Sequence, residues 1–377
     1  MNKDYCKRAG IVYLAVEILF LSISFSDRDF GFSMNLLVSQ LAVLVPGVVF
    51  VLMDKRSLHE KIGLGRISPS DILMCFIYFL LMRKVLGAVN FLSMFFTENS
   101  TTDYMLRMVA ETPAWVCILL VGVMPAVGEE LLFRGVLYSS FKKVSPLGAM
   151  LVSSFLFGVL HGNLNQFLYA MVAGVMFILI MEATGSLLAP SIIHCLIDLL
   201  SIVSIIALIR QYGEQSIVMY TEAVAQQSST EAMMESLPGE LLWGTLCLLG
   251  ALCLAAFVAR KNGRWENLCR VVKFRAEHGN GNKETAAISK EDSGVDLSRV
   301  QETDEENHCG NLSRVQETKE ENFGGDGGRV QETKEENFGG DANMVPECRI
   351  FSGPLIAGTI IGIIYMVLVE IAKNMVA

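Results

Sequence analysis

The sequence predicts an all-α fold, a polytopic bundle of about eight or nine transmembrane helices with a disordered acidic repeat segment before the last of them. Hydrophobic residues make up 52% of the 377 residues and charged residues only 18%, whereas a soluble protein is about 25% charged. The apolar residues also cluster in runs of roughly 20, the length that crosses a bilayer as a helix. A soluble globular protein is therefore excluded.

Nine apolar runs are the predicted spans. In chain order they cover about 10–26, 34–53, 72–96, 114–140, 147–161, 166–182, 187–209, 240–259 and 354–372. The first run contains Glu17 and lacks a small-residue cleavage site, so we expect a retained anchor rather than a signal peptide. Arg83 and Lys84 interrupt the third run, where they could snorkel, face a cavity or mark two shorter pieces.

Basic residues in the short loops predict the orientation, because such loops lie on the cytoplasmic side. They occur before the first span and after the second, fourth and eighth: Lys3, Lys7, Arg8, Lys55, Arg56, Lys61, Arg66, Lys142, Lys143, Arg260, Lys261 and Arg264. We therefore expect a multi-pass protein of the cell membrane, bacterial in the style of its loops, with a cytoplasmic N-terminus.

The predicted organisation has five parts. They are N-terminal transmembrane helices (1–113), a core with the candidate site (114–209), an extracytoplasmic loop with the eighth span (210–259), a cytoplasmic hydrophilic tail (260–349) and a C-terminal transmembrane helix (350–377).

The net charge of −9 comes from the hydrophilic tail. Residues 276–347 hold 7 Lys and Arg against 18 Asp and Glu, a net of −11, while the remainder holds 23 against 21, a net of +2. Nucleic-acid binding is not expected, because no basic stripe is large enough to neutralise many phosphates. The expected partners are the lipid bilayer and a peptide or protein substrate.

Within this tail a 15-residue unit occurs three times. The pentapeptide Arg-Val-Gln-Glu-Thr begins at Arg299, Arg314 and Arg329, and an acidic stretch follows each copy. A stacked solenoid needs an apolar face on each unit, which these lack. We therefore predict a disordered spacer, with docking of a partner as the alternative.

Ionisable residues inside the predicted spans single out a candidate site, because each costs on the order of 3 kcal/mol to insert. The fourth span carries Glu129, Glu130 and Arg134. Glu130 and Arg134 have the i, i+4 spacing of an ion pair on one helical face, which leaves Glu129 about 100° round the helix for other work. The alternative is that the ion pair of Glu130 with Arg134 only fixes helix packing and has no part in function.

Two histidines in later spans complete this set. Phe157 and His161 share one helical face, as do His194 and Asp198. Glu129 and His161 are each 16 residues from Ser145, so an antiparallel helix pair turning there places them at similar depth, about 24 Å from the turn. His194 comes early in its span, and meeting them would need tilt, an inward loop or a broken helix near 185–190.

With these residues the chain resembles the intramembrane endopeptidases of the CPBP, or Abi, family, which includes the type II CAAX prenyl proteases and the bacteriocin-processing and self-immunity proteins. The family pattern is EExxxR, then FxxxH, then HxxxN or HxxxD on successive membrane helices. Three parts of this chain, within about 115–204, resemble the pattern in the same order. They are Glu129-Glu130 with Arg134, Phe157 with His161, and His194 with Asp198. Asp198 replaces the Asn of eukaryotic-type prenyl proteases.

The resemblance implies peptide-bond hydrolysis within the membrane, on CAAX-type or on leader and bacteriocin peptides. Glu129 would activate water, His161 and His194 would hold it and stabilise the oxyanion, and Asp198 would orient them. Glu130 with Arg134 would brace the helix, and Phe157 belongs to the same motif set. No cofactor is expected, although Glu129, His161 and His194 would form the ligand set if zinc were bound.

Other function classes remain as alternatives. The main rival is a non-catalytic membrane immunity or scaffold protein with the same fold. A secondary transporter could also use Glu, His and Asp to relay protons, but no internal repeat across the spans supports one. Serine and aspartyl intramembrane proteolysis are not expected, because Ser186 lies in a helix-start loop and Asp198 is the only Asp well inside a span.

Overall fold

The computed structural model describes residues 4–25, 31–54, 62–97, 101–213, 215, 218, 230–272 and 350–376. These residues form helices and no strand, which confirms the predicted all-α class. The chain divides into two units, one of residues Met1–Phe274 with Pro346–Ala377 and the other of Arg275–Val345. The predicted repeats and their disorder lie outside the described residues.

The described part of the chain contains seven helices that are long and apolar enough to cross a membrane, so the protein is a multi-pass membrane protein. They are α2 (Phe32–Leu52), α4 (Pro69–Ser93), a continuous helix Ala114–Phe141, α10 (Leu164–Thr184), α11 (Leu188–Tyr212), α13 (Thr230–Lys261) and α15 (Gly353–Val376). Each coincides with one of the nine predicted spans.

The other two predicted spans are helices of a different kind. Helix α1 (Asp4–Ser24) has 21 residues but carries Lys7, Arg8 and Glu17, and this charge separates it from the seven. Helix α9 (Pro146–Leu160) is apolar but has 15 residues. At 1.5 Å per residue it extends about 22 Å, less than the roughly 30 Å hydrocarbon core.

Local sequence explains where several helices begin and end. Ser145 caps α9 by accepting a hydrogen bond from the Gly148 amide at 3.1 Å, with Pro146 following the cap. Asn163 caps α10 by accepting from the Asn165 amide at 2.9 Å. Helix α10 ends at Gly185, whose φ of 77° is left-handed and suits glycine.

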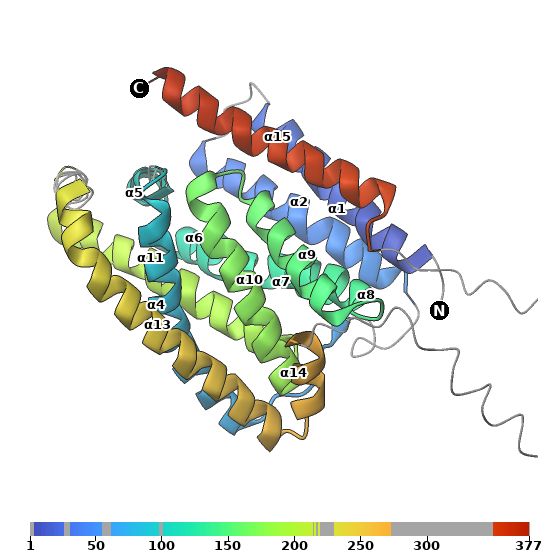
Figure 1. Ribbon diagram of the computed structural model, residues 1–377. Coiled ribbons are helices and arrows are strands. Elements are labelled where there is room, and N and C mark those ends of the chain that lie inside the picture. The colour runs from blue at the N-terminus through green and yellow to red at the C-terminus, as the bar shows by residue number, and fades with distance from the viewer. Residues whose placement is uncertain are drawn as a thin grey trace, which may run out of the picture. The chain divides into compact units, whose positions relative to one another are not determined.

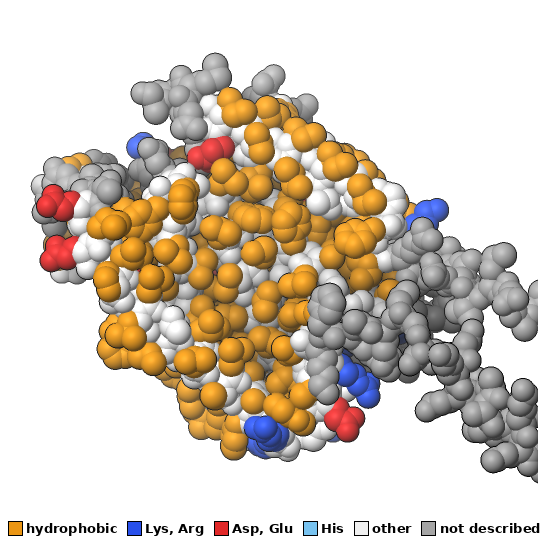
Figure 2. Space-filling model, in the orientation of Figure 1, with side chains coloured by type: hydrophobic (Ala, Val, Ile, Leu, Met, Phe, Trp, Pro, Cys, Tyr) orange, Lys and Arg blue, Asp and Glu red, His pale blue; other side chains and the backbone are white. Residues whose placement is uncertain are grey.

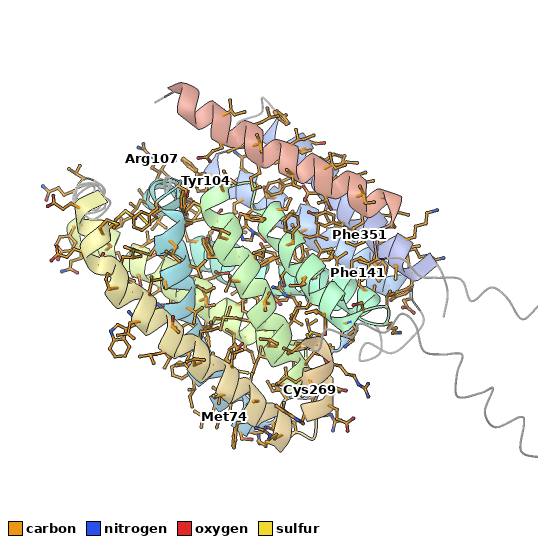
Figure 3. The ribbon with its side chains drawn as sticks, in the orientation of Figure 1. Met74, Tyr104, Arg107, Phe141, Cys269 and Phe351 are labelled. Carbon is orange, nitrogen blue, oxygen red and sulfur yellow. The ribbon has the colours of Figure 1, made fainter. Side chains whose placement is uncertain are left out.

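Segments far apart in the chain lie side by side within the first unit (Figure 1). Helix α15 runs along α1, and α13 runs along α4, while α9 and α10 pack together between these pairs. Helix α5 (Thr101–Glu111) lies at the opposite end from α14 (Trp265–Val272), as the labelled Tyr104 and Cys269 show (Figure 3). Function must therefore be sought between helices that sequence distance separates.

The outer face of this helical unit is apolar, as a membrane requires. In Figure 2 hydrophobic side chains cover the face shown, and charged side chains lie at its edges. Large exposed hydrophobic residues occur on α2, α4, α13 and α15, among them Val49, Leu73, Leu249 and Ile364. Because lipid tails are as apolar as these side chains, the exposure carries no solvation penalty in a bilayer.

Candidate active site

The helix Ala114–Phe141 changes its winding around the first two candidate residues. It passes from α6 (Ala114–Cys117) through η1 (Ile118–Val123), α7 (Met124–Glu130) and η2 (Leu131–Tyr138) to α8 (Ser139–Phe141), and both η segments are π-helical. Pro125 at the start of α7 lacks an N–H and cannot make the regular helical bond. The α-helical section with Glu129 and Glu130 thus lies between π segments, which frequently mark functional sites.

Gly128 allows the neighbouring helix to approach this section closely. A Cβ atom at Gly128 would lie 3.4 Å from the Leu44 Cβ and 3.7 Å from its Cα on α2. These are ordinary van der Waals distances, so α2 packs directly on the helix here, and Leu36 and Gln40 of α2 line the pocket beside Glu129. Gly128 is therefore a packing residue of the site.

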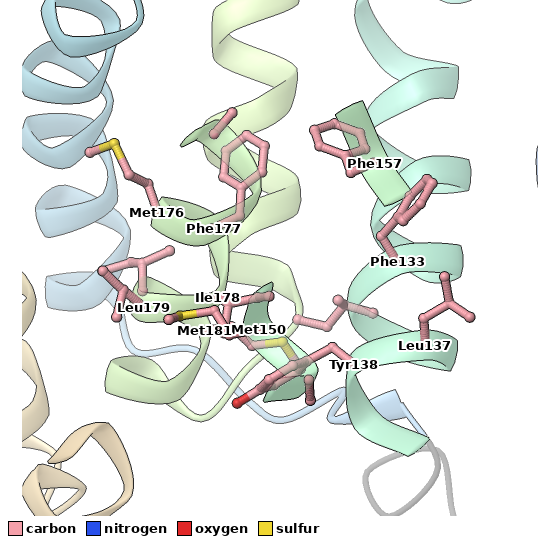
Figure 4. Packing of buried hydrophobic residues seen from close by; sticks show 14 of the residues in the cluster. Phe133, Leu137, Tyr138, Met150, Phe157, Met176, Phe177, Ile178, Leu179 and Met181 are labelled. Carbon is pink, nitrogen blue, oxygen red and sulfur yellow. The ribbon is translucent and has the colours of Figure 1, made fainter. Parts of the chain in front are cut away.

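Glu130 and Arg134 form an ion pair in the protein interior. The Arg134 Nη1 donates to Glu130 Oε1 at 2.9 Å, and both side chains are fully buried. The guanidinium carbon lies 4.3 Å from the Phe157 ring centre and 4.9 Å from that of Phe177, so the cation is sandwiched by aromatic faces. Figure 4 shows Phe157 between Phe133 and Phe177. Arg134 is thus held by one carboxylate and two rings.

The pairing of Glu130 and Arg134 is incomplete. Three buried atoms, Glu130 Oε2 and the Arg134 Nε and Nη2, have no hydrogen-bond partner within the described residues. Buried polar atoms normally have partners, so this shortfall marks the site as costly to the fold.

His194 links Glu130 to the pocket. Its Nδ1 lies 2.9 Å from Glu130 Oε1, its Nε2 lies 3.3 Å from Asp198 Oδ2, and the same Nε2 lies 3.9 Å from Glu129 Oε2. Since Glu130 Oε1 is an acceptor for Arg134, the His194 Nδ1 carries a hydrogen. A second proton must lie between Nε2 and Asp198 for that contact to be a hydrogen bond.

His161 follows the last residue of α9, and its orientation is fixed by its own helix. Its Nδ1 lies 2.8 Å from the Phe157 carbonyl oxygen, which can only accept, so Nδ1 is the donor. In the neutral ring Nε2 therefore keeps a lone pair. The Phe157 ring also packs edge-on against the imidazole, with ring centres 5.0 Å apart.

These side chains border one pocket of about 180 Å³. Five of the seven predicted site residues line it, and Glu130 and Arg134 lie behind it. The lining comes from seven helices, with Ala114–Phe141 counted as one: Leu36, Gln40, Leu86, Met105, Leu120, Val121, Pro125, Glu129, Phe157, His161, Gln166, Tyr169, Ala170, Ala173, Phe177, His194, Ile197 and Asp198. All seven predicted site residues are thus gathered in or directly behind one cavity.

A buried connection accounts for the position of His194. The chain between α10 and α11 lies inside the unit, with Ser186 fully buried. The Ser186 hydroxyl donates to the Gly65 carbonyl at 2.6 Å, and the Leu187 amide donates to the Gly63 carbonyl at 2.9 Å. The connection between these helices is therefore an inward loop, one of the three arrangements that the sequence left open.

Three polar residues that line the pocket were not predicted from the sequence, namely Gln40, Gln166 and Tyr169. The contact between His194 and Glu130 was missed too, because 64 residues separate them. Gln166 and Tyr169 are three residues apart in a span, so their shared helical face was a usable signal.

The donor arrangement does not fit a zinc ion. Among the described residues no three His, Cys, Asp or Glu side chains are placed to hold a metal. His194 directs one nitrogen to Glu130 and the other to Asp198, so neither ring nitrogen offers a lone pair to the pocket. No step below is routed through a metal.

Residues 111–200 match the family model of Rce1-like proteins, described as type II CAAX prenyl endopeptidase Rce1-like. The match confirms the resemblance. It covers Glu129, His161, His194 and Asp198, and the matched family is one of peptidases. Neither the curated proteins nor the solved structures gave a match to this chain.

Proposed function

We propose that this protein is an intramembrane endopeptidase that hydrolyses peptide bonds of membrane-associated substrates, with CAAX-type peptides as the first class to test. The observation that carries the proposal is the meeting of Glu129, His161, His194 and Asp198 in one pocket of an otherwise apolar helical unit, inside the matched region. Keeping such groups within spans costs free energy, which a catalytic role explains.

Glu129 is the proposed general base. Its side chain is 13% exposed, lines the pocket and has its nearest ionic contact at 3.9 Å, beyond hydrogen-bond distance. It is thus free to accept a proton from water, while Glu130 beside it is engaged by Arg134 and His194. As the water oxygen bonds to the scissile carbonyl carbon, Glu129 takes its proton and then delivers it to the departing amine.

The two histidines have different parts in this proposal. His161 accepts a hydrogen bond from the attacking water through Nε2, since Nδ1 is used on Phe157. His194 lies between Glu130 and Asp198, and it thereby fixes the Asp198 carboxylate in the pocket that Glu129 also lines. We propose that the reaction needs no metal, because each step is a proton transfer or a hydrogen bond made by these side chains.

The proposed orientation places the N-terminus and the acidic tail in the cytoplasm. Lys142, after the fourth predicted span, and Arg264, after the eighth, bind the same Glu182 carboxylate, at 2.9 and 3.3 Å. Loops that are rich in basic residues thus meet at one end of the unit, which supports a shared cytoplasmic side.

The test uses the purified full-length protein in lipid nanodiscs with a farnesylated C-terminal peptide and, separately, leader-bearing peptides. We expect Glu129→Gln to lower the rate of cleavage about 10²- to 10⁴-fold, since general-base catalysis contributes that much. Glu235→Gln is the matched control, because Glu235 is exposed on α13. Cleavage should persist with a chelator.

Equal cleavage by the wild type and Glu129→Gln would refute the base assignment. Loss of activity in chelator, restored by zinc, would refute the metal-free mechanism. If the wild type cleaves none of these peptides but binds one of them, the non-catalytic reading replaces the enzyme.

A further inference from the structure

Peptide hydrolysis at this site requires a hydrogen-bond donor for the oxyanion. The four proposed catalytic residues do not provide one. The tetrahedral intermediate places negative charge on the former carbonyl oxygen, and a positioned N–H or O–H must meet it. The His161 Nδ1 donates to Phe157, and the His194 Nδ1 donates to Glu130. The His194 Nε2 faces the Asp198 carboxylate at 3.3 Å.

Asp198 does not supply the missing donor. An Asn in that position would offer an amide N–H₂ group, whereas an ionised carboxylate only accepts hydrogen bonds. The proton between His194 Nε2 and Asp198 Oδ2 is used in the contact between those two atoms, so it is not available to the oxyanion. A donor must therefore come from another wall of the pocket.

Helix α10 presents such a donor. The residues Gln166, Tyr169, Ala170, Ala173 and Phe177 all line the pocket and follow helical spacing along one face of α10. Phe177 at the end of this stripe stacks on the His194 ring, with ring centres 5.1 Å apart and planes 25° apart. The face is thus fixed against the imidazole.

The hydroxyl of Tyr169 has a hydrogen left to give. The Gln166 Nε2 donates to the Tyr169 oxygen at 3.0 Å, and an amide nitrogen can only donate, so the tyrosine is the acceptor there. No acceptor for the Tyr169 hydrogen is found within the described residues. Tyr169 lines the same pocket as Glu129, His194 and Asp198, so its hydroxyl belongs to the cavity that holds the reacting groups.

We propose that Tyr169, oriented by Gln166, donates the hydrogen bond that stabilises the oxyanion during hydrolysis, in place of the amide that Asp198 lacks. This inference rests on the proposed endopeptidase function. As the water oxygen–carbon bond forms, the carbonyl π electrons move to oxygen and Tyr169 donates without losing its proton. When the carbon–nitrogen bond breaks, those electrons return and the amine takes the proton held by Glu129.

The test compares Tyr169→Phe with the wild type on a peptide that the wild type cleaves. Loss of one oxyanion donor lowers kcat about 10²- to 10³-fold, and KM should stay unchanged because the bond forms only in the transition state. Tyr212→Phe is the matched control: Tyr212 also accepts from a glutamine, Gln211 at 3.0 Å, but lies exposed at the end of α11. We expect no change there.

Two further measurements separate this role from others. In the Asp198→Asn background the Tyr169→Phe loss should shrink about tenfold or more, because the new amide supplies a second donor. A phosphinate analogue of the peptide should bind Tyr169→Phe more weakly than the wild type, while the uncleaved peptide binds equally. If Asp198→Asn turns over too slowly for kinetics, binding of the phosphinate to Asp198→Asn, with and without Tyr169→Phe, gives the same comparison.

The proposal would be overturned if Tyr169→Phe kept full kcat or raised only KM. It would also be overturned if kcat fell in Gln40→Leu but not in Tyr169→Phe, because Gln40, which also lines the pocket, would then be the donor. These outcomes leave the endopeptidase standing if Glu129→Gln is inactive. Absence of cleavage by the wild type itself would instead refute the proposed function, and with it this inference.

Discussion

Two groups of charged side chains in the same helical unit differ in how their charges are paired. The end network consists of Tyr138, Lys142, Glu182 and Arg264. Glu182 Oε1 accepts from Lys142 at 2.9 Å and from Tyr138 at 3.0 Å, and Oε2 accepts from Arg264 at 3.3 Å. One carboxylate thus has two cations and a hydroxyl.

The pocket group has the opposite balance. Three carboxylates, those of Glu129, Glu130 and Asp198, lie beside Arg134 and His194. Within the described part of the chain, Glu129 has no ionic contact shorter than 3.9 Å. Saturated pairing holds helices together, whereas incomplete pairing leaves groups able to exchange protons. The end network is thus paired as a structural element is, whereas the pairing in the pocket group is what the proposed proton transfers require.

Removing the single cation behind the pocket should have the largest effect on stability. Arg134→Met leaves the Glu130 carboxylate buried with no cation of its own, and breaking a buried pair costs about 3–5 kcal/mol. The free energy of unfolding, measured by SDS titration in mixed micelles, should fall by that amount. Arg210→Met, at an exposed position on α11, is the control. Equal stability of the two variants would contradict the assignment of Arg134 as the essential countercharge.

Neutralising the end network should lower stability less and spare turnover. Glu182→Gln keeps the shape of the side chain but loses the charge-assisted bonds from Lys142 and Arg264. Those cations are 33% and 29% exposed and can be hydrated, so we expect a loss of about 1–3 kcal/mol. The same titration measures it, beside a cleavage assay. If Glu182→Gln lowered kcat and left stability unchanged, the end network would not differ in role from the pocket group.

Removing a cation whose carboxylate keeps two other donors should have the smallest effect. Lys261 Nζ lies 2.8 Å from Asp71 Oδ1 but is 32% exposed, and Ser68 and Asn262 also donate to Asp71. Lys261→Met should therefore cost less than about 1 kcal/mol. The difference from the wild type should shrink further as salt rises. A larger loss, insensitive to salt, would show that this pair belongs with the buried ones.

Sequence periodicity predicted the spans well and the site only in part. Helices α4, α10 and α11 follow from runs of apolar residues, because insertion of a helix depends on its own composition. The i, i+4 pair of Glu130 with Arg134 follows from helix geometry for the same reason. The π-helical segments around Glu129 and the contact of Glu130 with His194 do not, since they depend on packing between segments that are distant in the chain.

The sequence by itself determined that this is a multi-pass all-α membrane protein, and which few ionisable residues lie within its spans. Those properties are local, because the bilayer acts on each helix separately. Only the tertiary structure decided that a buried loop brings His194 level with Phe177 and Glu130, and that Tyr169 enters the same pocket. Such placement depends on how helices pack, and in a membrane packing is set by contacts between side chains of different helices rather than by the composition of any one.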